Sequence, residues 1–177
     1  APIIRLVHDM IARAVAALRR GEEPDLEQAM GRGVEVELHV PALIPDTYLA
    51  DVQSRLTLYK RIASASDAAA LRELQVEMLD RFGLLPEPVK NLFEVAALKR
   101  MAEKVGVTIL DYGPQGGRIE FADDTTADPD ALIRLMQQSG GKYLMQGPQK
   151  LRILKQDTEE RARFDEARQI LSEINVQ

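Results

Sequence analysis

The 177-residue sequence has no cysteine and no tryptophan, and it contains only two histidines. Without cysteine, disulfides, thiolate nucleophiles, zinc ribbons and iron–sulfur clusters are all excluded. His8 and His39 are far apart in the chain, and neither has a second ligand at the spacing that metal sites use. Aromatic residues make up 5% of the chain, which argues against a platform for stacked nucleic-acid bases.

Long apolar runs and phosphate-binding loops are also missing. No segment approaches the ~20 apolar residues that span a bilayer. Charged residues interrupt the N-terminal 18 residues, so this segment does not have the pattern of a signal peptide. The glycine-rich segments 113–117 and 140–141 lack the Lys-Ser/Thr ending of a nucleotide-binding loop and indicate turns. Together with the absence of cysteine, this leads us to expect a cytoplasmic protein.

The charge pattern gives little sign of a bound ion or cofactor. A net charge of -5 argues mildly against a general nucleic-acid binder. The acidic run from Asp123 to Asp130 lacks the central glycine and closing glutamate of a calcium loop. Asp128 followed by Pro129 is instead typical of a helix N-terminus. We expect no metal and no cofactor.

The spacing of apolar residues predicts an α+β fold, in which a helical layer packs with short antiparallel strands and hairpins. We interpret residues 1–33 as an N-terminal helix and linker, and residues 34–177 as one compact domain. Alternating residues predict a strand over 34–40, and two hairpins are predicted around residues 107–121 and 142–154. The remaining predicted helices cover residues 46–63, 67–82, 86–105, 129–139 and 160–174.

Two helix ends have specific capping predictions. Asp46 follows Pro45 and is predicted to cap the helix that begins there. Asp157 and Glu160 have the spacing of a capping box at the start of the last helix.

One predicted helix carries charge over a broad face. If Leu71, Leu74 and Met78 point inward, then Glu73, Glu77 and Asp80 fall on the opposite side, with Arg81 beside them. Carboxylates at this spacing can hold arginines of a partner protein, but charged helix faces are usually only solvated. The cationic segment Arg55 to Arg61 also has two interpretations. Its cations can bind phosphate groups, or they can simply stabilise the C-terminal end of a helix.

Several ordered motifs resemble the C-terminal domain of the bacterial transcription-repair coupling factor (Mfd) over nearly the whole chain. The resemblance is carried by Ile44-Pro45-Asp46, Asp51, Arg55-Leu56 with Tyr59 to Ala65, Asp80 to Pro88, Glu35-x-Glu37-Leu38, Gly117 to Phe121, and Gly147-Pro148 with Leu151. The segment Arg19 to Pro24 also resembles the linker that joins the motor of that factor to this domain.

The resemblance implies a regulatory domain without catalytic activity. The full-length factor is an ATP-dependent DNA translocase of transcription-coupled nucleotide excision repair, which displaces stalled RNA polymerase and recruits UvrA. Its C-terminal domain docks on an N-terminal module that resembles UvrB, covers the UvrA-binding surface and restrains the motor. The contact residues implied for this chain are Glu77, Asp80 and Arg81. Motor motifs are absent, so we expect a fragment that has no ATPase activity.

Two other functions are considered. Direct DNA or RNA binding would use the cations Arg55, Lys60, Arg61, Lys99 and Arg100. Hydrolysis by paired carboxylates ranks last, because no histidine, metal cluster or loop supports it.

Overall fold

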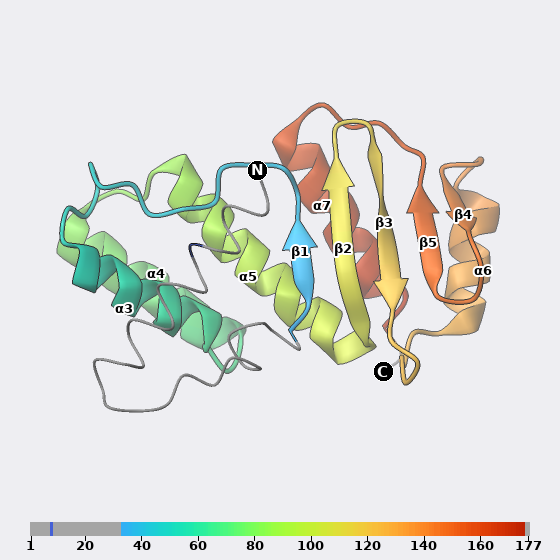
Figure 1. The fold of residues 1–177 in the computed structure, drawn as a ribbon, viewed down its shortest axis with the longest axis horizontal. Helices are drawn as coiled ribbons and strands as arrows, with labels where there is room; N and C mark the ends of the chain where they lie inside the picture. Colours follow the sequence, from blue (N-terminus) through green and yellow to red (C-terminus); the bar gives the residue numbers. More distant parts are fainter. Residues whose placement is uncertain (1–7, 9–32, 176–177) are drawn as a thin grey trace. The chain divides into compact units, whose positions relative to one another are not determined.

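The computed structural model describes residue 8 and residues 33–175. The predicted N-terminal helix and linker, apart from His8 and Gly33, lie outside the described residues, so the predicted division at residue 33 stays a prediction. Residues from Val34 onward form one compact unit. This unit has the α+β fold that the sequence predicts (Figure 1).

Five helices and five strands make up this unit. The helices are α3 (Val52–Ala63), α4 (Ala68–Phe82), α5 (Glu87–Val105), α6 (Pro129–Gln138) and α7 (Glu160–Glu173). The strands are β1 (Glu35–Glu37), β2 (Val107–Gly113), β3 (Gly116–Phe121), β4 (Tyr143–Met145) and β5 (Lys150–Ile153). Both predicted hairpins are confirmed, as β2–β3 and β4–β5.

The strands form one mixed sheet in the order β1-β2-β3-β5-β4. Every neighbouring pair is antiparallel except β1 and β2, which run parallel. The predicted antiparallel strands are therefore confirmed for β2 to β5, and the parallel pairing of β1 was not predicted. The reason lies in the connection: α3, α4 and α5 separate β1 from β2, and a long helical crossover returns the chain in the same direction.

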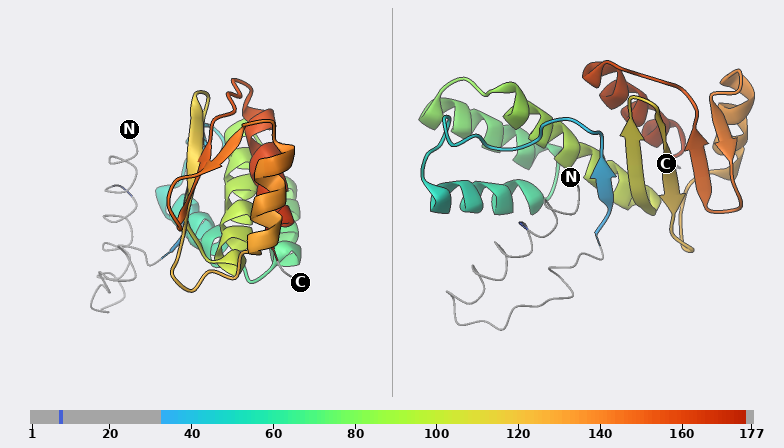
Figure 2. Two further views of the ribbon diagram at one scale, coloured as in Figure 1. Left: turned by 90° about the vertical axis from the view of Figure 1, so that its right-hand side faces the viewer. Right: turned by 45° about the horizontal axis from the view of Figure 1, so that its top comes forward.

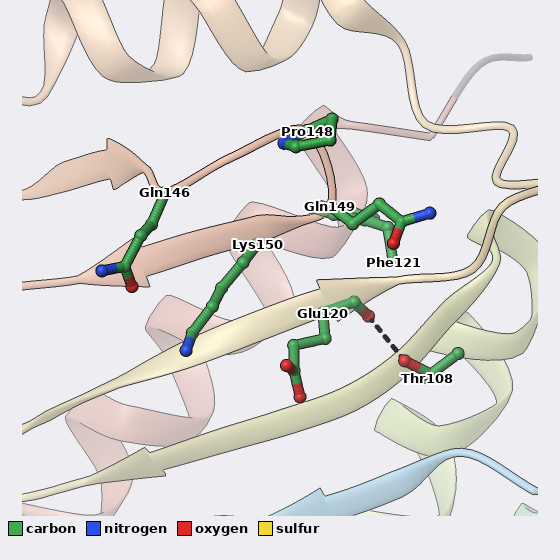
Figure 3. A pocket seen from close by; sticks show the side chains of 7 residues that line it. All are labelled: Thr108, Glu120, Phe121, Gln146, Pro148, Gln149 and Lys150. Atoms are coloured by element: carbon green, nitrogen blue, oxygen red, sulfur yellow. Dashed lines mark hydrogen bonds between the residues drawn. The ribbon is translucent and has the colours of Figure 1, made fainter.

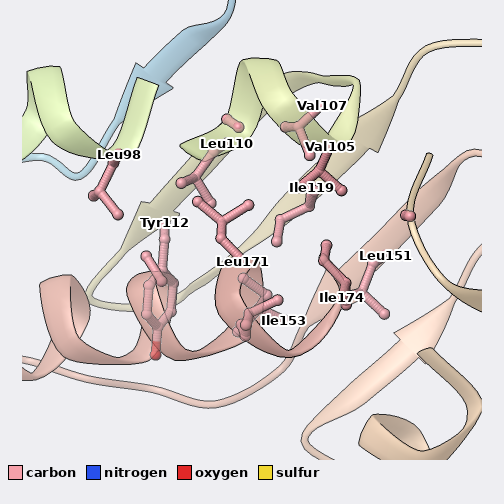
Figure 4. Close-up of a cluster of buried hydrophobic side chains, with 14 of the residues drawn as sticks. Leu98, Val105, Val107, Leu110, Tyr112, Ile119, Leu151, Ile153, Leu171 and Ile174 are labelled. Atoms are coloured by element: carbon pink, nitrogen blue, oxygen red, sulfur yellow. The ribbon is translucent and has the colours of Figure 1, made fainter. Parts of the chain in front are cut away.

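Three helices cover one face of the sheet. α5 and α7 pack on β2, and α6 packs on β4. Figure 2 shows α5, α6 and α7 on the same side of the sheet. Alternate side chains of the strands meet α7 in the main hydrophobic core, part of which Figure 4 shows. Leu110, Tyr112 and Ile119 are fully buried there, and so are Leu151 and Ile170.

A second cluster of apolar side chains lies among the first three helices. Its buried members are Ile44, Leu58, Ile62, Leu71, Leu74, Met78, Val89 and Phe93. α5 belongs to both clusters, because Val89 and Phe93 lie in this one while Leu98 and Ala102 lie in the main core. This arrangement confirms the predicted helical layer and joins it to the sheet through one continuous helix.

The helix ends show which capping predictions were right. The carboxylates of Asp67 and Asp128 accept backbone hydrogen bonds at the starts of α4 and α6, and the cap at Asp128 was predicted. Asp46 does not cap α3, which begins later and is capped by Asp51. Asp157 forms no capping box, because its carboxylate accepts a hydrogen bond from the hydroxyl of Tyr112 instead.

Within the described residues, no helix is both long enough and apolar enough to cross a lipid bilayer.

Candidate interaction surface

Helix α4 separates apolar and charged side chains as its sequence predicts. Leu71, Leu74 and Met78 are buried against the second cluster, and Met78 is fully inaccessible. Gly83 ends the helix with a φ of 91°, a conformation that favours glycine, and its N–H bonds to the carbonyl of Leu79. The three contact residues that the resemblance implies, Glu77, Asp80 and Arg81, are called the α4 ridge below.

Glu77 is already engaged by two arginines of the same chain. Arg61 of α3 donates two hydrogen bonds to its carboxylate, at 2.8 and 2.6 Å. Arg81 adds a third bond, at 3.1 Å. The hydrogen bond from Arg61 is the main cause that lowers the pKa of Glu77 from 4.5 to about 2. Glu77 therefore holds α3 and α4 together at the surface.

Asp80 and Arg81 are the members of the ridge that face solvent. Asp80 is exposed, and none of the described residues forms an ion pair with its carboxylate. The Arg81 side chain is 56% exposed, and its guanidinium carbon lies 4.8 Å from the centre of the Phe82 ring. The ring and Glu77 restrict where Arg81 points, which leaves its remaining N–H groups available to a partner.

The structure adds apolar side chains to this surface that sequence reasoning missed. Val76 is 56% exposed, Leu79 is 42% exposed, and Leu84, just beyond the helix, is 86% exposed. Val76 and Leu79 could have been recognised, because they fall outside the inward stripe of Leu71, Leu74 and Met78. Exposed apolar side chains rimmed by polar groups are a feature of protein interaction sites.

Most of the cations proposed for the alternative nucleic-acid surface bind acceptors within the fold. Arg55 donates to the carbonyls of Leu49 and Ala50, and Arg61 binds Glu77. Arg100 donates to the carbonyl of Ser66. Three of the five candidate cations thus bind acceptors of the chain itself, which weakens the case for a phosphate-binding patch.

A hollow of about 430 Å³ lies on the sheet beside the β4–β5 turn (Figure 3). Its lining includes the polar side chains of Thr108, Glu120 and Lys150. The Thr108 hydroxyl donates to the carbonyl of Glu120, whose carboxylate pairs with Arg118. No described nucleophile–base pair lies in this hollow, so the geometry supports no reaction there.

His39 is the described histidine that has an acidic partner. Its Nε2 lies 2.6 Å from a carboxylate oxygen of Asp111, which also pairs with Arg118. Both side chains lie at the surface, where the contact links the end of β1 to β2. In residues 33–175, no group of histidine, aspartate and glutamate side chains is arranged to hold a metal ion.

A family model described as "TRCF domain" matches residues 38–132. A transcription-repair-coupling factor of Escherichia coli K12 is 40% identical over 96% of this chain, and that of Haemophilus influenzae is 42% identical over 90%. The chain spans only 15% and 14% of the lengths of these relatives.

A crystal structure of the C-terminal domain of a transcription-repair coupling factor has the same fold. It superposes with a TM-score of 0.64, covers 80% of this chain and 94% of its own, and is 24% identical in sequence.

Proposed function

The chain belongs to the TRCF domain family, the C-terminal domain of transcription-repair coupling factors, and we propose that it is a non-catalytic docking domain. In this proposal it binds the N-terminal UvrB-like module of its own full-length protein. Docking covers the surface that binds UvrA and restrains the DNA translocase, so the domain acts on UvrA and RNA polymerase only indirectly.

The observation that carries this proposal is the exposure of the α4 ridge next to exposed apolar side chains. Asp80 and Arg81 present opposite charges at the surface, and Leu84 extends beside them. A charged pair surrounded by apolar groups gives an interface both specificity and buried area.

Because Glu77 is paired within the chain, the three residues of the α4 ridge have different roles in this proposal. Asp80 and Arg81 are the groups free to contact the partner, and Glu77 positions Arg81 through their hydrogen bond. Removing one member of a partly buried interfacial ion pair costs about 2–5 kcal/mol, and a pair at the rim costs far less. A preference of a few kcal/mol for the docked state is enough to hide a binding site most of the time.

The proposal is tested by titrating this chain against the isolated N-terminal module at low salt. We expect Asp80→Ala to weaken binding by ten-fold or more, because a carboxylate in a central ion pair is worth at least ~1.4 kcal/mol. Glu77→Ala should weaken binding less than Asp80→Ala, because Glu77 acts through Arg81. Binding is measured by isothermal titration calorimetry.

Asp124→Asn provides the control, since Asp124 is an exposed carboxylate in the loop between β3 and α6. It should bind the module as the unmodified chain does. If Asp80→Ala and the control bind equally well, the α4 ridge is not the docking surface.

A further inference from the structure

The outer side of α4 carries a stripe of residues that no other described element covers. Its members are Ala69, Arg72, Glu73, Val76, Leu79, Asp80 and Gly83, and all of them are exposed. From one turn of the helix to the next they are three or four residues apart, which places them along one line of the helix. This set is called the outer stripe below; it shares only Asp80 with the α4 ridge.

The outer stripe is symmetric in sequence about Val76. Arg72 precedes Val76 by four residues, and Asp80 follows it by four. When two copies of a helix pair antiparallel about a two-fold axis at Val76, residues at equal distances before and after that position face each other. Arg72 of each copy then faces Asp80 of the other, and two ion pairs form across the axis.

The other positions of the stripe fit the same register. Val76 meets its own equivalent at the axis, and Leu79 faces Glu73, whose aliphatic stem can pack against it. Ala69 faces Gly83, so the helix backbones can approach closely at both ends of the contact. Leu84, which is 86% exposed, then lies opposite two small residues, Ala68 and Ala69.

A parallel pairing is disfavoured by the same charges. It would place Arg72 against Arg72 and Asp80 against Asp80, and like charges in contact oppose association. The charge order along α4 therefore selects the antiparallel arrangement.

We propose that α4 is a self-association surface, through which two copies of this chain pair antiparallel about Val76. The contact is isologous, so it closes at two copies. Since it uses Asp80, which the proposed docking surface also uses, a chain cannot do both at once. A single helix pair buries less than the ~1,200 Å² of a standard interface, so the dimer is weak and forms at high protein concentration.

Charge reversal tests the register by sedimentation velocity over a range of concentrations. Arg72→Asp alone places two carboxylates opposite each other at both contacts, and Asp80→Arg alone places two guanidinium groups there. Each variant should self-associate at least about ten-fold more weakly than the unmodified chain, because two attractive contacts become repulsive. When the two variants are mixed in equal amounts, both contacts of a mixed pair join a carboxylate of one chain to a guanidinium group of the other, so the mixture should recover self-association.

The double variant Arg72→Asp with Asp80→Arg provides the rescue. It exchanges the two charges within one chain, so both contacts across the axis again join opposite charges. We expect it to self-associate like the unmodified chain. If either single variant associated weakly only because its fold was damaged, the double variant would carry the same damage and would not recover.

Arg134→Asp on α6 is the matched control, since Arg134 is 62% exposed and lies outside the outer stripe. This control should associate like the unmodified chain, and circular dichroism should show that every variant is folded. The proposal is overturned if the unmodified chain stays monomeric at all concentrations, if the single variants associate normally, or if the double variant does not recover.

Docking on the N-terminal module is measured separately, at concentrations below self-association. Arg72→Asp retains the α4 ridge and should still bind the module. Loss of self-association with intact docking therefore separates this proposal from the proposed function.

Discussion

The carboxylate of Glu77 shows how a surface residue can be committed within its own domain. Sequence spacing places it beside Arg81, one helical turn away, and that contact is present. Its stronger partner, Arg61, comes from another helix, and only the packing of α3 on α4 brings the two together. A partner arginine would have to displace Arg61 before it could bind Glu77 in the same bidentate manner.

This pairing makes the contribution of Glu77 to stability depend on pH. The pKa of its carboxyl group is about 2 in the folded chain, against 4.5 ordinarily. Stability from the ionised form is therefore fully present above about pH 4.5 and is lost as the pH falls toward 2. Glu77→Gln should be less stable than the unmodified chain at pH 7, and the difference should shrink through this interval.

Urea denaturation at a series of pH values measures that difference. Glu103→Gln, which removes an exposed carboxylate from α5, serves as the control. A gap between the Glu77→Gln variant and the unmodified chain that stays constant from pH 7 to pH 2 would contradict the role given to Arg61 and Arg81.

Arg163 is a residue whose role sequence alone could not reveal. It lies on α7 with only 2% of its surface exposed, and it donates to the carbonyls of Leu38, Asp157 and Thr158. These acceptors lie at the end of β1 and just before α7. Because carbonyl groups are present at every position, no sequence pattern marks the ones that will bind a buried arginine.

At the scale of secondary-structure elements, the sequence predicts helices best where caps and apolar spacing agree. The start and end of α4 are marked by Asp67 and Gly83, and the predicted range 67–82 agrees with both. The start of α3 was not, because Asp46 and Asp51 are both suitable caps. Residues 46–48 form a turn, and the helix begins after Asp51, whose carboxylate accepts the N–H of Ser54.

The same ambiguity affected the inward face of α3. Val52 is apolar but 59% exposed, whereas Leu58 and Ile62 are buried. Several apolar positions of α3 lie next to one another around the helix, so periodicity alone does not select between them. Packing against α5 settles the choice.

Gly106 lies between α5 and β2, at a position where the structure leaves no room for a side chain. It has a φ of 79° at the end of α5, and a Cβ placed there would lie 2.7 Å from the Cα of Thr125. Gly140 also has a positive φ, of 64°, but nothing lies within 4 Å of its Cβ position. Gly140→Ala should cost about 1 kcal/mol of unfolding free energy from backbone conformation alone.

Gly106→Ala should cost about 1–3 kcal/mol more than Gly140→Ala, because the backbone at Thr125 must also move. Chemical denaturation of both variants measures the two costs. Equal losses of stability would show that the close approach between Gly106 and Thr125 has no energetic consequence.

At the scale of the whole molecule, the TRCF domain match covers fewer residues than the folded unit does. The match ends at residue 132, before β4, β5 and α7. Those later elements supply a large part of the main core, including Leu151, Phe164 and Ile170, each no more than 1% exposed.

A fragment of residues 34–132 should therefore not fold cooperatively. It would leave β3 without its neighbour β5 and expose the apolar face that α7 covers. Circular dichroism during urea denaturation should show a sharp transition for residues 34–175 and none for the shorter fragment. A cooperative transition in the shorter fragment would mean that the α3–α5 cluster and the first three strands are stable alone.

The strand order β1-β2-β3-β5-β4 also has a consequence for synthesis on the ribosome. β4 emerges before β5, yet among the described strands it pairs with β5 alone, so this partner is still missing when β4 first appears. Closure of the sheet therefore waits until β5, which follows β4 in the sequence, has also been synthesised. Until then, the growing polypeptide carries an incomplete sheet whose apolar side chains would need shielding by a chaperone or by the ribosome surface.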